Sequence, residues 1–228
     1  MDGQDLYHPR VAQQTLSEIK ALLATHGLRP RHRFGQNFLH DAGKMEQIIA
    51  AAELSPGDVV LEVGPGTGAL SVRLLEAGVK LVAVEIDRDL EPILIDQLNA
   101  AQSPPTPVGG HRRYSLIIDD VLAGKHAINS RVWEALSDAK PQAAGFKLVA
   151  NLPYNVASPL IANLLLAPFE VTHPTPETRH PTPALTLAVV MIQREVADRL
   201  TAPPGGKDYG PLGILAQAMC EVQRICVL

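Results

Sequence analysis

The sequence is poor in cysteine and in aromatic residues, and it lacks an excess of positive charge. Its two cysteines, Cys220 and Cys226, form no metal-ligand pattern with other Cys or His, so we interpret both as small buried apolar residues. Aromatic residues make up 4% of the chain, which leaves aliphatic side chains and alanine to build the core. The formal net charge of -4 lacks the basic bias of many nucleic-acid binders, so any RNA binding must rest on local basic patches or on a region outside this chain.

Long apolar runs are missing as well. None approaches the roughly 20 residues of a membrane-spanning helix, and the polar, acidic N-terminus carries no signal-peptide pattern. We therefore expect a cytoplasmic protein without a membrane partner. The 228 residues, 46% hydrophobic and 19% charged, suit one large globular domain or a domain with a small appendage.

The N-terminal part predicts two amphipathic helices separated by a basic segment. Apolar residues at helical spacing cover 11–26, with Gly27 as the C-cap. A second helix is expected over 41–53, with Asp41 as its N-cap candidate. The segment between them, 29–33, reads Arg-Pro-Arg-His-Arg and is not helical in pattern.

From residue 58 onward, short apolar strands alternate with helices. We expect strands over 59–63, 80–86, 114–118, 146–150 and 185–192, and helices over 69–76, 88–99, 159–166, 194–200 and 212–220. Continuous apolar strands separated by helices predict an α/β fold in which a mostly parallel sheet is covered by helices on both faces. The last of these strands is unusually apolar, so we expect it in the centre of the sheet.

Two proline-rich stretches, 103–113 and 168–183, interrupt this alternation. We interpret both as surface insertions, because a strand resumes directly after each. The chain is therefore divided into an N-terminal helical extension over 1–28 and one main domain over 29–228.

The turn after the first predicted strand, Gly64-Pro65-Gly66-Thr67-Gly68, is the first candidate binding site. Glycines let the backbone approach a ligand closely, and the following helix N-terminus offers unpaired N–H groups. On this motif alone a methyl-donor site, a dinucleotide site and a purely structural turn all remain open. Pro65 favours the methyl donor, because it removes an N–H group where a pyrophosphate needs one.

Acidic residues stand at the ends of the next two predicted strands. Glu85 ends the second strand, where a carboxylate can accept hydrogen bonds from both hydroxyls of a ribose. Asp119 and Asp120 follow the third strand, and Asp120 can accept a hydrogen bond from the amino group of an adenine. On spacing alone, a solvated loop acid is an equally good interpretation of Asp120.

The motif Asn151-Leu152-Pro153-Tyr154 follows directly on the fourth predicted strand, at the edge where open parallel sheets bind ligands. It suits methylation of an adenine amino group, a poor nucleophile because its lone pair is delocalised into the ring. The Asn151 amide oxygen and the Leu152 carbonyl can accept the two amino hydrogens, while Tyr154 stacks on the extruded base. The alternative is an ordinary helix N-terminal turn in which Asn bonds locally and Tyr is packed.

Several motifs occur in the order found in one family: Phe34 to Leu39, Glu62 to Gly68, Val84 to Asp87, Asn151 to Asn155 with Ser158-Pro159, Gln193 to Val196, and Lys207 to Gly210. From about Arg29 to the C-terminus, apart from the proline-rich stretches, the sequence resembles the small-subunit (16S) rRNA adenine dimethyltransferases, known in bacteria through kasugamycin sensitivity. The resemblance implies a Rossmann-like class I methyltransferase fold with S-adenosylmethionine as the cofactor. It also implies N6,N6-dimethylation of two adjacent adenosines in the 3′-terminal hairpin of small-subunit rRNA, in a pre-ribosomal 30S particle, by a monomer that uses no metal.

The resemblance assigns roles residue by residue. It places cofactor contacts on Asn37, Leu39, Gly64, Gly66, Glu85, Ile86, Asp120, Val121 and Asn151. It makes Asn151, Leu152, Pro153 and Tyr154 the catalytic motif, and we expect RNA binding by Arg29, Arg31, Arg33 and Phe34. For the arginines the alternative is a solvated linker, and for Phe34 it is a core position.

Members of the family usually continue into a further antiparallel strand beside the fifth strand and then into a small helical domain. The sixth strand, expected over 222–228, therefore lacks its partner, and we interpret the chain as C-terminally shortened. Three other functions stay open: a non-catalytic rRNA-binding assembly factor, a related 23S rRNA adenine methyltransferase, and a nicotinamide oxidoreductase. The Asn-Leu-Pro-Tyr motif argues against the last of these.

Overall fold

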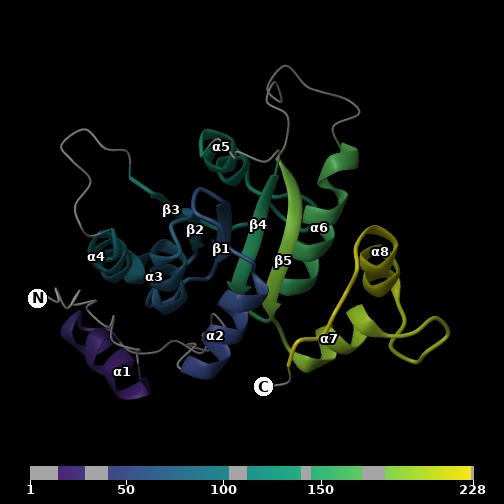
Figure 1. Ribbon diagram of the computed structural model, residues 1–228, viewed down its shortest axis with the longest axis horizontal. Helices are drawn as coiled ribbons and strands as arrows, with labels where there is room; N and C mark the ends of the chain where they lie inside the picture. Colours follow the sequence, from purple (N-terminus) through teal and green to yellow (C-terminus); the bar gives the residue numbers. More distant parts are fainter. Residues whose placement is uncertain (1–14, 29–40, 103–111, 140–144, 171–182, 227–228) are drawn as a thin grey trace, which may run out of the picture.

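The computed structural model describes residues 15–28, 41–102, 112–139, 145–170 and 183–226. Its centre is a five-stranded sheet in the order β3-β2-β1-β4-β5, in which every neighbouring pair of strands is parallel. The strands are β1 (Val59–Val63), β2 (Lys80–Glu85), β3 (Tyr114–Ile118), β4 (Gly145–Asn151) and β5 (Ala184–Met191). Figure 1 shows helices packed around this sheet, so the predicted α/β fold is confirmed.

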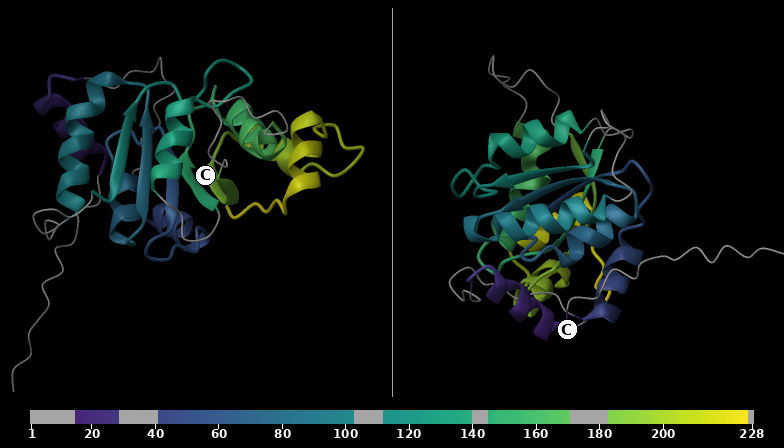
Figure 2. Two further views of the ribbon diagram at one scale, coloured as in Figure 1. Left: turned by 90° about the horizontal axis from the view of Figure 1, so that it is seen from above. Right: turned by 90° about the vertical axis from the view of Figure 1, so that its left-hand side faces the viewer.

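Helices cover both faces of the sheet (Figure 2). Two apolar layers, one on each face, hold them there. Successive residues of β1 belong to different layers: Val60 packs in one, and Val59 and Leu61 in the other. The first layer contains residues of α1 (Leu16–Thr25), α2 (Ala42–Ala51), α3 (Ala69–Glu76) and α4 (Glu91–Ala101), and the second those of α5 (Ser130–Asp138) and α6 (Ala157–Glu170). A smaller cluster packs α7 (Arg194–Thr201) and α8 (Pro211–Met219) against α6.

The second helix begins and the first helix ends as the sequence predicts, but α1 begins at Leu16 and not at residue 11, because Thr15 is its N-cap and accepts the Glu18 N–H. The Asp41 carboxylate accepts the Lys44 N–H, which makes it the N-cap of α2. After α1, Gly27 adopts a positive φ of 69°, and the N–H of Leu28 reaches back to the Leu23 carbonyl at 2.8 Å. Leu23 is buried in the same layer as α2, α3 and α4, so the described part of the N-terminal extension shares its core with the main domain.

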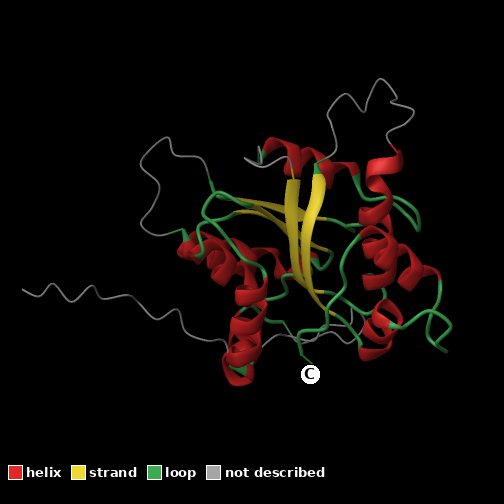
Figure 3. Cartoon of the chain, turned by 45° about the vertical axis from the view of Figure 1, so that its right-hand side comes forward, coloured by secondary structure: helices red, strands yellow, loops and turns green. Residues whose placement is uncertain are grey.

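The prediction that the most apolar strand is central is wrong. Among the described residues, β5 pairs with β4 alone, so it forms an edge of the sheet, with exposed Ala184, Thr186 and Ala188. An apolar groove of about 580 Å³ runs along this edge, between α6, α7, α8 and residues 221–226. α7 and α8 lie beyond the strand (Figures 1 and 3). The apolar sequence of β5 suggested that a strand would cover it on each side. The order of the strands in the sheet, which the sequence pattern does not show, leaves it with one neighbouring strand in the described part of the chain.

The region after α8 also differs from its prediction. Residues 221–226 form no strand, because no described strand lies beside them to accept ladder hydrogen bonds. Cys220 and Cys226 are both exposed, which overturns their interpretation as buried apolar residues. The thiol of Cys220 donates to the Ala216 carbonyl, as a residue at the end of a helix can.

One predicted boundary and one missing element are also corrected. The helix α6 runs on to Glu170 and contains Pro168, so the proline-rich stretch begins later than predicted. The helix α5 is not among the predicted elements. Its signals are an Asn129 N-cap, whose side chain accepts the Arg131 N–H, and buried Val132 and Leu136 one turn apart.

In the ranges that the structure describes, no helix has both the length and the apolar character needed to cross a membrane.

Candidate functional site

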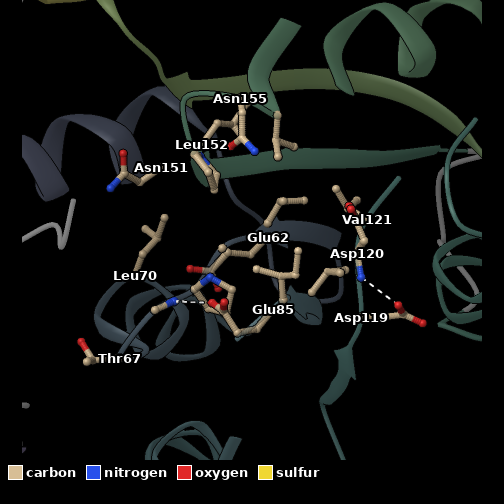
Figure 4. A pocket seen from close by; sticks show the side chains of 18 of the residues that line it. Glu62, Thr67, Leu70, Glu85, Asp119, Asp120, Val121, Asn151, Leu152 and Asn155 are labelled. Atoms are coloured by element: carbon tan, nitrogen blue, oxygen red, sulfur yellow. Dashed lines mark hydrogen bonds between the residues drawn. The ribbon is translucent and has the colours of Figure 1, made fainter. Parts of the chain in front are cut away.

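A pocket opens beyond the carboxyl ends of β1, β2 and β4, with the loop after β3 on one side (Figure 4). This is the edge at which open parallel α/β sheets bind ligands. The lining residues come from segments far apart in the sequence: Glu62 to Thr67, Ala69, Leu70, Val84 to Ile86, Asp119 to Val121, Asn151 to Pro153, Asn155 and Val156. The pocket therefore joins the glycine-rich turn to the Asn-Leu-Pro motif.

The glycine-rich turn after β1 has a backbone that other residues adopt only with strain. Gly64 and Gly66 have φ angles of 70° and 61°. A Cβ on Gly64 would lie 3.2 Å from both Cδ and Cγ of Pro153, which is tighter than ordinary packing. The glycine thus permits close contact between the turn and the Asn-Leu-Pro motif.

Glu85 ends β2 as a buried carboxyl that holds the same turn in place. Its Oε2 accepts the Gly66 N–H at 3.1 Å, and its Oε1 accepts the Asp87 N–H at 2.9 Å. Burial raises the pKa of Glu85, although these backbone hydrogen bonds oppose the shift. Each carboxylate oxygen has two lone pairs, so both can accept a further bond from a ligand hydroxyl.

The hydrogen bond to Glu85 helps to choose between the ligand classes left open by the glycine motif. A dinucleotide pyrophosphate binds to free backbone N–H groups at this turn. The N–H of Gly66 is already donated to a carboxylate, and the ring of Pro65 removes another. The turn is therefore better suited to a ligand without phosphates.

Glu62 is a second buried carboxyl at the pocket, and it is not among the site residues predicted from the sequence. It lies in β1 with 2% of its surface exposed, and Ser71 of α3 donates its hydroxyl to Oε2 at 2.6 Å. Burial, with a smaller contribution from the negative charge of Glu85, raises the pKa of Glu62 to about 8. An acid inside an otherwise wholly aliphatic strand was the available signal.

The loop after β3 forms the third side of the pocket. Asp119 makes an ion pair with Arg131 at 3.1 Å and accepts the Asp120 N–H, and these contacts lower its pKa, the backbone bond most. Asp120 is exposed, and its Oδ1 accepts the Leu122 N–H at 2.9 Å. Val121 is buried against the second apolar layer. The loop is thus organised by its own hydrogen bonds.

The Asn-Leu-Pro-Tyr motif leads from β4 into α6. Asn151 is the last residue of β4, and the Leu152 N–H bonds to the Met191 carbonyl of β5 at 3.0 Å. The Pro153 carbonyl accepts the N–H groups of Val156 and Ala157, which starts the helix. The first three motif residues line the pocket, whereas Tyr154 is 46% exposed and outside its lining.

Of the other predicted site residues, Gly64, Gly66, Glu85, Ile86, Asp120 and Val121 also line this pocket. Ile86 is an apolar side chain with 46% of its surface exposed, as a residue that packs on a ligand can be. The predicted contacts of Asn37, Leu39, Phe34 and the arginines at 29, 31 and 33 lie outside the described residues. Their roles stay predictions.

The ionisable side chains that line the pocket are all acids. Four carboxyls line it, at positions 62, 85, 119 and 120, and the lining residues that the structure describes include no Lys, Arg or His. This set suits a ligand that carries positive charge and donates hydrogen bonds. S-adenosylmethionine fits both requirements, because it has a sulfonium ion, an amino group and ribose hydroxyls. In the same described ranges, no three His, Cys, Asp or Glu side chains are grouped as metal ligands.

Comparison with known proteins agrees with this geometry. Residues 27–228 match the family described as ribosomal RNA adenine dimethylase. The protein named "Ribosomal RNA small subunit methyltransferase A" from Mycolicibacterium vanbaalenii is 40% identical over 199 residues, which are 85% of this chain and 52% of that protein. Its namesake from Thermosynechococcus vestitus is 37% identical over 201 residues, 88% of this chain and 63% of that protein. The chain thus spans between about half and two thirds of these relatives.

A solved structure shows the same fold. The crystal structure of a dimethyladenosine transferase from Plasmodium falciparum aligns with a TM-score of 0.57 and 26% sequence identity. The alignment covers 83% of this chain and 55% of that one.

Proposed function

The chain belongs to the ribosomal RNA adenine dimethylase family, and we propose that it transfers methyl groups from S-adenosylmethionine to adenosines of small-subunit ribosomal RNA. The product is N6,N6-dimethyladenosine at two adjacent positions of the 3′-terminal hairpin, formed in a pre-ribosomal 30S particle. One observation carries the proposal: Asn151, Leu152 and Pro153 line the same carboxyl-rich pocket as Glu85 and Gly66. Methyl transfer requires the methyl donor and the acceptor base to lie side by side, and one pocket lined by both groups of residues allows this.

In this proposal S-adenosylmethionine supplies an electrophilic methyl group on its sulfonium ion. Glu85 accepts hydrogen bonds from the ribose hydroxyls with the lone pairs that the backbone leaves open. Ile86 covers the adenine, and Asp120 accepts a hydrogen bond from its amino group. Gly64 and Gly66, which line the pocket, contact the methionine part.

The acceptor side uses Asn151 and the backbone of Leu152. Their oxygens accept the two amino hydrogens of the target adenine and favour a pyramidal nitrogen whose lone pair faces the methyl group. The proton leaves after the nitrogen has become cationic, so no strong base is required. The exposed ring of Tyr154 stacks on the extruded base. We further propose that the enzyme acts as a monomer in the cytoplasm.

The decisive experiment compares three proteins in methyl transfer to immature small subunits. The parent chain should transfer radiolabelled methyl groups. Asn151→Ala should transfer at least about a hundredfold more slowly, by analogy with the loss of one aligned transition-state hydrogen bond. Glu134→Ala, on the exposed surface of α5, is the matched control and should keep the parental rate.

Circular dichroism of each protein shows whether the fold is retained. Parental activity of Asn151→Ala would remove the amide from the mechanism. A parent that binds the RNA and transfers nothing would favour the non-catalytic assembly factor.

A further inference from the structure

The buried carboxyl of Glu62 has no role in the proposed methyl transfer. It lines the donor pocket, yet only 2% of its surface is exposed. Its hydrogen bond with Ser71 is the one that the described residues provide. Glu62 and Glu85 lie near one another on adjacent strands (Figure 4). A buried acid beside a second acid needs either a proton or a cation.

The charged groups around Glu62 do not supply a cation in the described part of the chain. Glu85 comes from the end of β2, Asp87 from the turn that follows it, and Asp120 and Asp119 from the loop after β3, where Asp119 is paired with Arg131. The basic residues of α3 and β4, which adjoin β1, form ion pairs with acids other than Glu62. Arg73 of α3 pairs with Glu46 and Glu76, and Lys147 of β4 pairs with Asp58.

We propose that Glu62 is protonated in the free protein and ionised in the complex with the methyl donor, so that donor binding releases a proton. The proposal rests on the proposed use of S-adenosylmethionine, and it assigns Glu62 as the residue that compensates the positive charge of that ligand. Ser71 is the positioning residue, because its hydroxyl donates to the carboxylate that forms.

The physical reason is the balance between burial and charge. Without a ligand, burial keeps the proton on Glu62 and raises its pKa to about 8. A positive charge placed in the same pocket favours the carboxylate and lowers that pKa. The methyl donor carries the sulfonium charge, whereas the product left after methyl transfer is a neutral thioether. Glu62 therefore favours the donor over the product, and more so once it has lost its proton.

Calorimetric titration of the ligand-free protein at about pH 7, in buffers of different ionisation enthalpy, counts the protons released. For the parent we expect close to one proton more with S-adenosylmethionine than with S-adenosylhomocysteine. We also expect donor affinity to rise by up to about tenfold per pH unit until the pH reaches the pKa of free Glu62. Glu62→Gln keeps an acceptor for the Ser71 hydroxyl but cannot ionise, so the extra proton and the slope should both disappear.

Two further variants sharpen the test. Glu76→Gln changes an exposed acid of α3 and should behave as the parent does. Ser71→Ala removes the bond that stabilises the carboxylate, so its proton release should move to higher pH; this variant also tests the idea if Glu62→Gln does not fold. Protons taken up or released by the amino groups of the ligands are the same with every protein variant, so they cancel when the variants are compared.

Equal proton release by parent and Glu62→Gln would overturn the assignment. So would a Ser71→Ala profile that coincides with the parental one. If the parent binds neither ligand, the proposed function itself fails and this inference falls with it. A parent that binds both ligands with the same proton count leaves the function intact and refutes the role of Glu62 alone.

Discussion

Replacing Glu62 by Gln should change the pH dependence of stability in the absence of any ligand. The folded protein holds the proton of Glu62 more tightly than the unfolded chain does, because the pKa is about 8 in the fold against an ordinary 4.5. Between these two values the folded state binds more protons, so the free energy of unfolding falls as pH rises. Gln does not titrate and should not show this fall.

The size of the effect follows from the shift. One pKa unit corresponds to about 1.4 kcal/mol. The parent should therefore lose roughly 3 kcal/mol relative to the variant between about pH 4.5 and pH 7, and about 5 kcal/mol above pH 8, as order-of-magnitude values. Glu85 is also raised in pKa and interacts with Glu62, so part of this loss is shared between the two acids.

Urea unfolding of both proteins at several pH values between about 5 and 9 measures this difference directly. Titration of other groups is common to both proteins and cancels. The exposed Glu76→Gln serves as the control, with a flat difference from the parent. A Glu62→Gln difference that stays equally flat across the range would show that Glu62 is ionised in the free protein, and the reasoning from burial would be wrong.

Three other substitutions test the site. Glu85→Ala should weaken S-adenosylmethionine binding by roughly 1–3 kcal/mol, the scale of lost charge-assisted hydrogen bonds, and unchanged affinity in calorimetry would exclude the ribose role. Gly64→Ala should lower both stability and donor affinity, since the backbone has φ 70° and the new Cβ would press on Pro153; thermal unfolding with and without donor checks this. Replacing Arg29, Arg31 and Arg33 together by Gln should weaken RNA binding and flatten its salt dependence while donor affinity stays unchanged. Parallel salt plots would return that segment to the role of a linker.

The sequence predicted local structure well where one residue pattern has one physical meaning. The range of β1 agrees residue for residue, because a short apolar run bounded by a turn and a glycine motif leaves few alternatives. The position of β5 was predicted wrongly, because an apolar strand can lie in the centre of a sheet or at its edge. Strand order depends on contacts between distant segments, which periodicity does not contain.

The candidate site was predictable to a similar degree. Motifs located the glycine turn, Glu85 and the Asn-Leu-Pro segment, and the structure gathers them at one pocket. Glu62 went unselected because the sequence shows only an acid inside an aliphatic strand. Its hydroxyl partner Ser71, its neighbouring acid Glu85 and its place at the pocket depend on the fold. The bond between Gly66 and Glu85 likewise required coordinates, and it is this bond that separates the ligand classes.

The edge position of β5 has a consequence for the behaviour of the chain in solution. Residues 184–192 read Ala-Leu-Thr-Leu-Ala-Val-Val-Met-Ile, with neither charge nor proline, which is the composition of segments that stack into cross-β aggregates. Natural edge strands are blunted by lysine or proline, and here Pro183 and Arg194 stand only at the flanks. We therefore expect self-association of the chain to begin at this strand. A lysine at the exposed, mid-strand Ala188 would place a charge on that edge, at a position that does not line the donor pocket.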